Sequence, residues 1–303
     1  MRVFITGASG NIGSAVVSEL INAGHQVIGL ARSEASAQLI TAAGAVPLRG
    51  SLADLDVLRA GAESADGVIN LAFSADFANL GPGIAEEANT VRTIGEALAG
   101  TGKAFVHAGG TPFTPGRAST EDDPSATQGP MGGRGLNANA VLALAEHAVR
   151  SSVVRLPRSV HLRGSAYGFA SALIANAQRT GVSAYVGDGT QRWPAVHRQD
   201  AARLFRLALE EATAGTNLHA VADEGDTMRS LADRIGEVLG LPVEPVPAEH
   251  FGALGAIYSV DQPSSSALTR ARFRWTPSHP SLLEDLAAGD YPDLARWAEG
   301  RGL

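Results

Sequence analysis

Three glycines near the start of the chain have the spacing of a phosphate-binding turn. Gly7, Gly10 and Gly13 lie between an apolar segment, residues 2–6, and a helical pattern over residues 12–23. Glycine lets the backbone turn tightly and approach a pyrophosphate, while the start of the next helix supplies N–H donors and the positive end of a dipole. An ordinary glycine turn is the alternative, but the strand–turn–helix context favours dinucleotide binding. The residues expected to contact the cofactor here are Gly7, Ser9, Gly10, Asn11, Ile12 and Gly13.

The end of the second apolar segment, GLARSE at residues 29–34, indicates which dinucleotide binds. NAD sites carry an acidic residue there, which accepts a hydrogen bond from the ribose 2′-hydroxyl and would repel a 2′-phosphate. This chain has Ala31, Arg32 and Ser33 instead. Arg32 can pair with a phosphate and stack on adenine, and Ser33 can donate a hydrogen bond, so we expect NADP(H). The alternative is a solvated Arg32, with Glu34 serving as the acid of an NAD site.

The elements that must position these residues can be read from the hydrophobic pattern. Six short apolar segments alternate with helical patterns up to Pro157; the segments are residues 2–6, 25–30, 45–48, 67–73, 103–108 and 152–157. The helical patterns cover residues 12–23, 33–43, a short stretch near Leu52, 84–99, and the stretch that follows the glycine-rich loop at 129–135. This alternation predicts an α/β fold with a doubly wound parallel Rossmann sheet, which binds ligands beyond the carboxyl ends of its strands.

The pattern changes after Pro157. Residues 158–168 read as a loop, helices are predicted over 169–180 and 198–212, and residues 217–222 are expected to return to the sheet as a strand. The remainder is punctuated by prolines, as in LPVEPVP and FRWTPSHP. We therefore expect a Rossmann dinucleotide-binding domain from residues 1–157 and 195–222, with a smaller C-terminal substrate lobe from residues 158–194 and 223–303.

Composition excludes several other classes of protein. The 303 residues are 45% hydrophobic and 18% charged, which is typical of a globular chain, and the net charge of −7 gives no reason to expect nucleic acid or an anionic membrane as a partner. No cysteine is present, so disulfides and thiolate chemistry are excluded, and the eight histidines show no His-x-x-x-His pair, so we expect no metal. Neither a signal peptide nor a membrane-spanning run is recognisable, and the expected location is the cytoplasm.

The order of short motifs along the whole chain resembles that of the extended short-chain dehydrogenase/reductases, the epimerase and dehydratase branch. These motifs are TGASGNIG, GLARS, GVINLAF, TEDDP, VVRLPRSVH, GDGTQRWPAVHRQDAARL and RWTPSHPSLLEDL. The resemblance implies a Rossmann sheet, a C-terminal substrate lobe, and hydride transfer to or from a nicotinamide that lies beside RLPRSV. It also adds Leu71, Ala72, Phe73, Pro157, Ser159 and Val160 to the expected cofactor site.

The proton-transfer residues that this family normally uses are missing. The family has Tyr-x-x-x-Lys before the sixth strand, and counting back from that strand places the lysine near Arg134 and the tyrosine near Pro130. The only tyrosines of the chain are Tyr167, Tyr185, Tyr258 and Tyr291. The family's serine or threonine region reads VHAGGTPF, which leaves Thr111. The resemblance therefore implies that Arg134 replaces the lysine that holds the nicotinamide ribose, as a cation that cannot relay protons; a solvated loop residue is the alternative.

Loss of the tyrosine matters least when the substrate itself can carry the negative charge. Reduction of a simple ketone creates a strongly basic alkoxide, for which a positioned acid contributes ~10²–10⁴-fold. A quinone or extended enone gives a phenolate-like or enolate anion, which hydrogen bonds or a cation can stabilise and water can protonate. Thr111 and His161 are the expected donors beside Arg134, and the expected substrate pocket consists of Phe73, Thr111, His161, Tyr167 and Trp193. A structural His161 and a core Trp193 remain open alternatives.

We therefore expect an NADPH-dependent reductase that acts on a quinone-like or polycyclic aromatic carbonyl compound, in secondary metabolism. One alternative is a reductase or dehydrogenase of simpler alcohols, steroids or aldehydes, with a proton donor from elsewhere in the pocket. Another is a non-catalytic NADP(H)-binding sensor or scaffold. Epimerisation of a sugar nucleotide is disfavoured, because in the family mechanism that cycle uses the tyrosine as its base.

Overall fold

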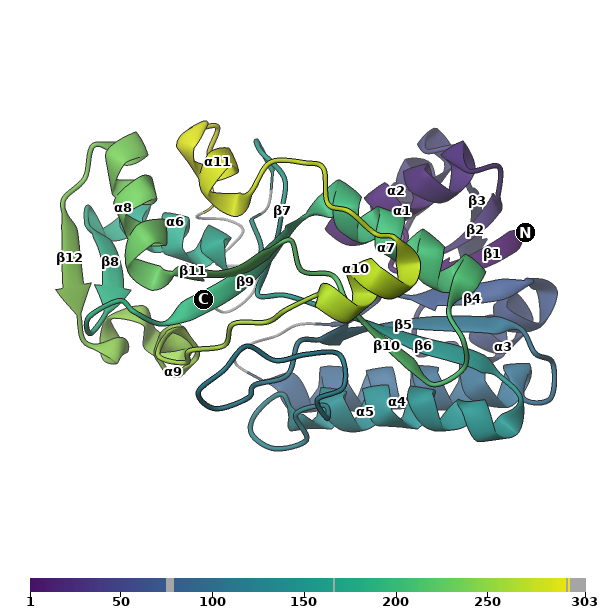
Figure 1. Ribbon diagram of the computed structural model, residues 1–303. Helices are drawn as coiled ribbons and strands as arrows, with labels where there is room; N and C mark the ends of the chain where they lie inside the picture. Colours follow the sequence, from purple (N-terminus) through teal and green to yellow (C-terminus); the bar gives the residue numbers. More distant parts are fainter. Residues whose placement is uncertain (75–78, 166, 293, 295–303) are drawn as a thin grey trace.

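Seven parallel strands form the central sheet of the protein. The structure is a computed structural model that describes residues 1–74, 79–165, 167–292 and 294 (Figure 1). The strands are β1 (Arg2–Thr6), β2 (Gln26–Ala31), β3 (Val46–Arg49), β4 (Gly67–Asn70), β5 (Ala104–Gly110), β6 (Arg150–Leu156) and β10 (Thr216–His219), in the order β10-β6-β5-β4-β1-β2-β3. This is a doubly wound order, with the chain reversing direction across the sheet between β3 and β4. The predicted α/β Rossmann fold is confirmed, and β10 returns to the sheet beside β6 as expected.

Helices cover both faces of this sheet (Figure 1). One face packs against α1 (Asn11–Asn22), α2 (Glu34–Ala42) and α7 (Arg198–Glu211), and the other against α3 (Leu55–Ser64), α4 (Leu80–Leu98) and α5 (Gly132–Ala143), which continues into a 3-10 turn, η1 (Leu144–His147). Successive strand residues point to opposite faces, so Val3 and Ile5 join the first apolar cluster while Phe4 joins the second. Within the described residues, no helix is both long and apolar enough to cross a membrane.

A smaller body of structure lies beyond the carboxyl edge of the sheet, at the left of Figure 1. It contains a three-stranded sheet, β7 (Ser159–His161), β9 (Arg192–His197) and β11 (Asp223–Thr227), and a strand pair, β8 (Ser183–Val186) and β12 (Val243–Val246). Its helices are α6 (Ala170–Thr180), α8 (Met228–Leu239), η2 (Ala248–Leu254), α9 (Gly255–Tyr258) and α11 (Leu282–Ala287). A separate apolar cluster, with Trp193 and Tyr258 among its buried members, holds this lobe together.

The structure differs from the sequence expectation in several places, among them the start of α4, at Leu80 rather than residue 84. Residues 158–168, expected to form a loop, contain the strand β7, which pairs with β9 in parallel. A strand of three residues is too short to show an alternating pattern in the sequence. The helix α3 begins at Leu55 rather than near Leu52. Finally, α10 (Ala267–Phe273) and Trp275 pack on the Rossmann side: Phe273 and Trp275 belong to the cluster that includes α1 and α7, and the indole of Trp275 donates to the Asp200 carbonyl at 3.0 Å.

Candidate active site

The glycine turn has the geometry that a bound pyrophosphate requires. Gly7 has a φ of +72°, and a Cβ on Gly13 would lie 2.0 Å from the Gly7 carbonyl oxygen, so neither position tolerates a side chain. Gly10 is the N-cap residue of α1, where no side chain caps the helix and the first turn contains no acidic residue. The N–H groups of the first turn of α1 therefore remain for an anion. Ser9, Asn11 and Ile12 complete the turn, which fits a dinucleotide.

The end of β4 packs directly against this turn. A Cβ on Gly7 would lie 2.9 Å from the Ala72 nitrogen, and the N–H groups of Leu71 and Ala72 donate to the backbone oxygen and the hydroxyl of Thr6, each at 3.3 Å. Phe73 follows at the same edge. The structure thus brings together the glycine turn and the segment that the resemblance assigned to the cofactor.

The two residues expected to select the cofactor differ in their surroundings. Arg32 is exposed, and no described residue forms a hydrogen bond or ion pair with its side chain. Ser33 is instead the N-cap of α2: its hydroxyl accepts from the Ser36 N–H at 3.1 Å. Glu34, the alternative acid, is exposed in the first turn of α2 and lies 3.8 Å from Arg49. Arg32 is therefore available to a phosphate, whereas the helix cap already uses the Ser33 hydroxyl.

A chain of buried polar groups runs beneath the carboxyl edge of the sheet. The Thr6 hydroxyl donates to Asn70, whose amide nitrogen lies 3.1 Å from Nδ1 of His107. The other ring nitrogen of His107 lies 3.8 Å from Oε1 of Glu87. Burial lowers the pKa of His107 to about 4, so this histidine is neutral at pH 7. The chain connects β1, β4 and β5 to a buried carboxylate on α4.

Arg134 neutralises that carboxylate. It lies in the first turn of α5, and its Nε and Nη2 donate to Oε1 of Glu87 at 3.1 and 2.9 Å. Nη2 also donates to the Ala108 carbonyl at 2.9 Å, and the guanidinium lies 4.1 Å from the centre of the Phe73 ring. Asn137 adds a second donor to Glu87. The alternative of a solvated loop residue is therefore wrong, and the atom of Arg134 that has no partner among the described residues is Nη1.

Thr111 and Pro157 lie side by side at the ends of β5 and β6. The Thr111 N–H donates to the Leu156 carbonyl at 3.0 Å, and the Thr111 carbonyl accepts from the side chain of Gln262 at 2.6 Å. Ser159, at the start of β7, is buried, and its hydroxyl has no hydrogen-bond partner among the residues that the structure describes. Val160 packs against the Rossmann cluster. Thr111, Pro157 and Ser159 thus occupy one edge, as the sequence predicts for a site at the carboxyl ends of the strands.

His161 lies in different surroundings from Thr111. It ends β7, is fully buried, and its Nδ1 lies 2.7 Å from Oδ2 of Asp285 in α11. Its ring packs edge-on against His197, with centroids 5.4 Å apart. None of the described contacts joins His161 to Thr111 or Arg134. These contacts support the open alternative of a structural histidine.

Two of the expected pocket residues are buried in the lobe. Trp193 stacks on Tyr258 with ring centroids 5.0 Å apart and donates its indole N–H to the Val260 carbonyl at 3.1 Å. Tyr167 is fully buried, and its hydroxyl accepts from the Gly164 N–H at 3.3 Å. The core alternative for Trp193 is therefore supported. The remaining pocket residue, Phe73, contacts Arg134 as described above.

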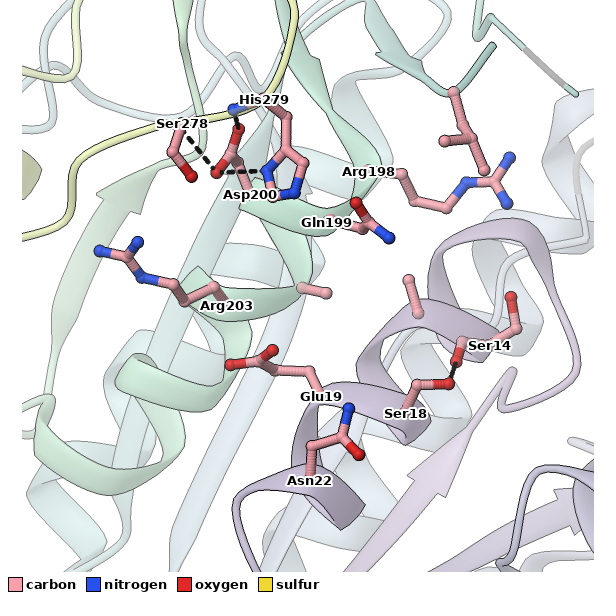
Figure 2. Close-up of a pocket in the computed structure, with 13 residues that line it drawn as sticks. Ser14, Ser18, Glu19, Asn22, Arg198, Gln199, Asp200, Arg203, Ser278 and His279 are labelled. Atoms are coloured by element: carbon pink, nitrogen blue, oxygen red, sulfur yellow. Dashed lines mark hydrogen bonds and ion pairs between the residues drawn. The ribbon is translucent and has the colours of Figure 1, made fainter. Parts of the chain in front are cut away.

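A cavity of about 420 Å³ lies between α1 and α7 (Figure 2). Its α1 side extends from Ser14 to Asn22, so it follows the flank of that helix rather than its N-terminal end. Asp200 and His279 line it, and ligand-type atoms of these two residues and of His197 lie within 4.8 Å of one another. Asp200 already accepts from the N–H groups of Ser278 and His279, each at 3.1 Å, and these contacts anchor the segment around Trp275. Helical spacing could not reveal this group, because His279 is remote in sequence.

Sequence reasoning missed Glu87, His107, Arg158 and Gln262. A signal existed for Glu87, since it shares the inner face of α4 with Val91 and Ile94 at helical spacing. A carboxylate on an otherwise apolar face predicts a buried partner. No comparable pattern marks Gln262, because the two residues that its side chain contacts, Thr111 and Arg158, are far away in the sequence.

Comparisons with known proteins agree with this architecture. A model of the NAD dependent epimerase/dehydratase family matches residues 3–221. An uncharacterised protein of Schizosaccharomyces pombe is 43% identical over 295 residues, which cover 96% of this chain and 100% of that protein. The 2′-dehydrokanamycin reductase of Streptomyces kanamyceticus is 28% identical over 260 residues, covering 82% of this chain and 70% of the reductase. The structure of UDP-glucose 4-epimerase from Thermotoga maritima, with UDP-glucose, has a TM-score of 0.77 at 18% identity and covers 96% of this chain and 97% of its own; it shares the fold.

Proposed function

Because the chain belongs to the NAD dependent epimerase/dehydratase family, we propose that it uses NADPH to reduce a quinone-like or polycyclic aromatic carbonyl compound. The coarser conclusion, an oxidoreductase or epimerase dependent on a nicotinamide dinucleotide, follows from the family. The choice of NADPH rests on Arg32, whose exposed guanidinium has no partner among the described residues. The choice of substrate class rests on the placement of the tyrosines.

The placement of the tyrosines carries the proposed substrate class. All four belong to the lobe: Tyr167, Tyr185 and Tyr258 are buried in its apolar cluster, and Tyr291 packs against it. Burial raises the pKa values of Tyr167 and Tyr258 above their usual value. The count back from β6 puts the family's tyrosine near Pro130, which precedes α5. A site without this acid is suited to a carbonyl compound that can delocalise the charge left by hydride transfer.

The bound NADPH supplies the hydride, and residues of this chain bind and orient the reactants. In this proposal the turn from Gly7 to Gly13 and the start of α1 bind the pyrophosphate, and Arg32 binds the 2′-phosphate. Glu87 and the Ala108 carbonyl hold the guanidinium of Arg134, and its remaining nitrogen, Nη1, would donate to the nicotinamide ribose. The Thr111 hydroxyl donates a hydrogen bond to the carbonyl oxygen, and water delivers the proton.

The proposal is tested by following NADPH oxidation with 9,10-phenanthrenequinone, 1,4-naphthoquinone, a steroid ketone and cyclohexanone. We expect turnover with the two quinones, faster with NADPH than with NADH. The matched control is the Gly10→Val variant, which corrects for oxidation that does not need the cofactor site. Turnover of cyclohexanone or the steroid at rates equal to those of the quinones would contradict the proposed substrate class.

A second candidate is a reductase of simpler carbonyl groups, such as a ketone on a sugar ring. The observation in its favour is the similarity to 2′-dehydrokanamycin reductase. Such a substrate needs a proton donor, and in this chain that donor would be Thr111 together with a water molecule. Turnover of a keto-sugar without turnover of quinones would favour this candidate, and NADPH binding without turnover of any compound would favour a sensor or scaffold.

A further inference from the structure

A second arginine lies at the same edge of the sheet, in surroundings unlike those of Arg134. Arg158 follows Pro157, two residues beyond the end of β6. Its guanidinium carbon lies 5.1 Å from the centre of the Trp193 ring and 5.7 Å from that of Phe169. Among the described residues, no carboxylate forms an ion pair with it. Arg158 is therefore a cation beside two aromatic rings, with no acidic partner in the described part of the chain.

The partner that Arg158 does have is neutral. Oε1 of Gln262 accepts from Nε of Arg158 at 2.9 Å and from Nη2. The amide nitrogen of Gln262 donates in turn to the Thr111 carbonyl at 2.6 Å, which determines which end of the amide faces the arginine. A glutamate at position 262 would cancel the charge, whereas the glutamine orients the guanidinium and leaves the charge uncompensated. This arrangement ties Arg158 to the end of β5.

The two arginines of β6, Arg150 and Arg155, donate chiefly to carbonyl and hydroxyl oxygens, as Arg158 does to an amide oxygen. Arg150, at the opposite end of this strand, donates to the carbonyls of Leu209 and Ala212 at 2.7 and 3.1 Å. Arg155 donates to the Asp123 carbonyl and the Ser125 hydroxyl at 2.8 and 3.1 Å. Nη1 of Arg158 has no acceptor among the described residues. Burial lowers the pKa of Arg158 to about 10, so it stays charged at pH 7, and a desolvated cation interacts strongly with an anion that reaches it.

We propose that Arg158 binds an anionic oxygen of an aromatic substrate, next to Thr111 at the ends of β5 and β6. The inference rests on the proposed function: the quinone is reduced by the hydride of NADPH and a proton from water, NADPH becomes NADP⁺, and Arg158 stabilises the oxygen that is negatively charged before the proton arrives. It follows that the site prefers substrates with an ionised hydroxyl beside the carbonyl over neutral analogues of the same shape.

The test compares two ligands in calorimetry with the NADP⁺ complex. One is 2-hydroxy-1,4-naphthoquinone, which is ionised at neutral pH, and the other is its neutral 2-methoxy analogue. We expect the anion to bind at least about tenfold more tightly, the range of a charge-assisted hydrogen bond. The Arg158→Met variant should lose this preference while changing the affinity for the methoxy compound less than about threefold.

Two further variants keep the test decisive. Gln262→Glu gives Arg158 a carboxylate partner and should abolish the preference without removing the arginine. Arg150→Met removes an arginine that has no acid partner among the described residues and lies at the far end of β6, and it should leave the preference unchanged. An anion preference that persists in folded Arg158→Met or Gln262→Glu overturns the inference. Binding is measured without turnover, so the two claims can fail separately. Quinone reduction with no anion preference would overturn the inference on Arg158 and leave the proposed function standing. An Arg158-dependent preference without quinone reduction would support the inference and contradict the proposed function.

Discussion

Arg134 and Arg158 show how the partner of a charge determines what that charge can do. Both side chains lie at the carboxyl edge of the sheet, over an aromatic ring. Arg134 is paired with the buried carboxylate of Glu87, so most of its charge is neutralised within the protein. Arg158 is oriented by the neutral amide of Gln262 and retains its charge. Arg134 therefore stabilises the buried carboxylate of Glu87, whereas Arg158 is suited to bind a negatively charged ligand.

The pair of Glu87 and Arg134 predicts a strong energetic coupling. Glu87→Gln and Arg134→Met should each lower the free energy of unfolding, by about 3 kcal/mol, because each leaves one partner without its counter-charge. The double variant should be more stable than the sum of the two losses implies, with a coupling of about 1.5–3 kcal/mol. Urea unfolding of the four proteins measures this. Losses that add to within about 0.5 kcal/mol would show that the pair is not coupled.

Arg32 predicts the cofactor preference. The wild-type protein should bind NADPH more tightly than NADH, and Arg32→Ala should reduce the difference by about 1.5–3 kcal/mol, the range of a hydrogen bond to a charged group. Titration calorimetry with both cofactors gives the two affinities. Arg92→Ala, which removes an exposed arginine of α4, serves as the control. Equal affinities for NADPH and NADH in the wild-type protein would contradict the expected preference.

At the scale of elements, the glycine turn before α1 combines two separate requirements. Gly13 is required by packing, since its Cβ would collide with the Gly7 carbonyl. Gly10 has an extended conformation, with φ −78° and ψ 173°, which any residue can adopt, and its Cβ would lie 3.2 Å from the same oxygen. Its glycine is therefore explained better by the ligand than by the backbone.

This difference predicts opposite outcomes for two substitutions in one turn. Gly13→Ala should lower the free energy of unfolding by about 1–3 kcal/mol, as expected for overpacking. Gly10→Val should lower the free energy of unfolding by no more than about 1 kcal/mol, since valine is a poorer N-cap residue than glycine, but it should abolish NADPH binding, because the side chain would occupy the space of the pyrophosphate. Thermal unfolding and calorimetry separate the two effects. Full-strength NADPH binding by a folded Gly10→Val protein would place the cofactor elsewhere.

At the scale of the whole molecule, three buried histidines make the fold sensitive to acid. Burial lowers the pKa values of His107, His197 and His219 from 6.5 to about 4. As the pH falls through 6.5 the unfolded chain takes up these protons, whereas the folded chain does not until about pH 4. Their contribution to stability is therefore fully present above pH 6.5 and is lost toward pH 4, with a slope of at most about 1.4 kcal/mol per pH unit for each histidine.

The prediction is checked by urea unfolding between about pH 6 and pH 4.5, the window in which these histidines differ between the two states. His107→Gln should make the dependence of stability on pH shallower by up to about 1.4 kcal/mol per pH unit. His147→Gln, which changes an exposed histidine on η1, is the matched control. An unchanged slope in the folded His107→Gln variant would show that His107 takes up its proton equally in both states.

The sequence by itself determined the features that depend on neighbours along the chain. Hydrophobic periodicity predicted the strands of the Rossmann sheet and the helices α1, α2 and α7 to within a few residues. The glycine spacing predicted the turn before α1, and counting back from β6 gave the expected positions of the family's tyrosine, near Pro130, and lysine, near Arg134. These signals are local, since a helix, a strand or a turn is specified by residues close together in sequence.

Only the tertiary structure decided which polar side chains meet. Glu87 is 47 residues from Arg134, Gln262 is 104 residues from Arg158, and Asp285 is 124 residues from His161. Each contact depends on which strands and helices become neighbours and at what height along them, so no spacing within a single element could reveal it. The same holds for the burial that places Trp193 and the four tyrosines in the lobe. Residue types indicated what chemistry is available, and the packing of distant elements decided which of those residues keep a free charge at the site.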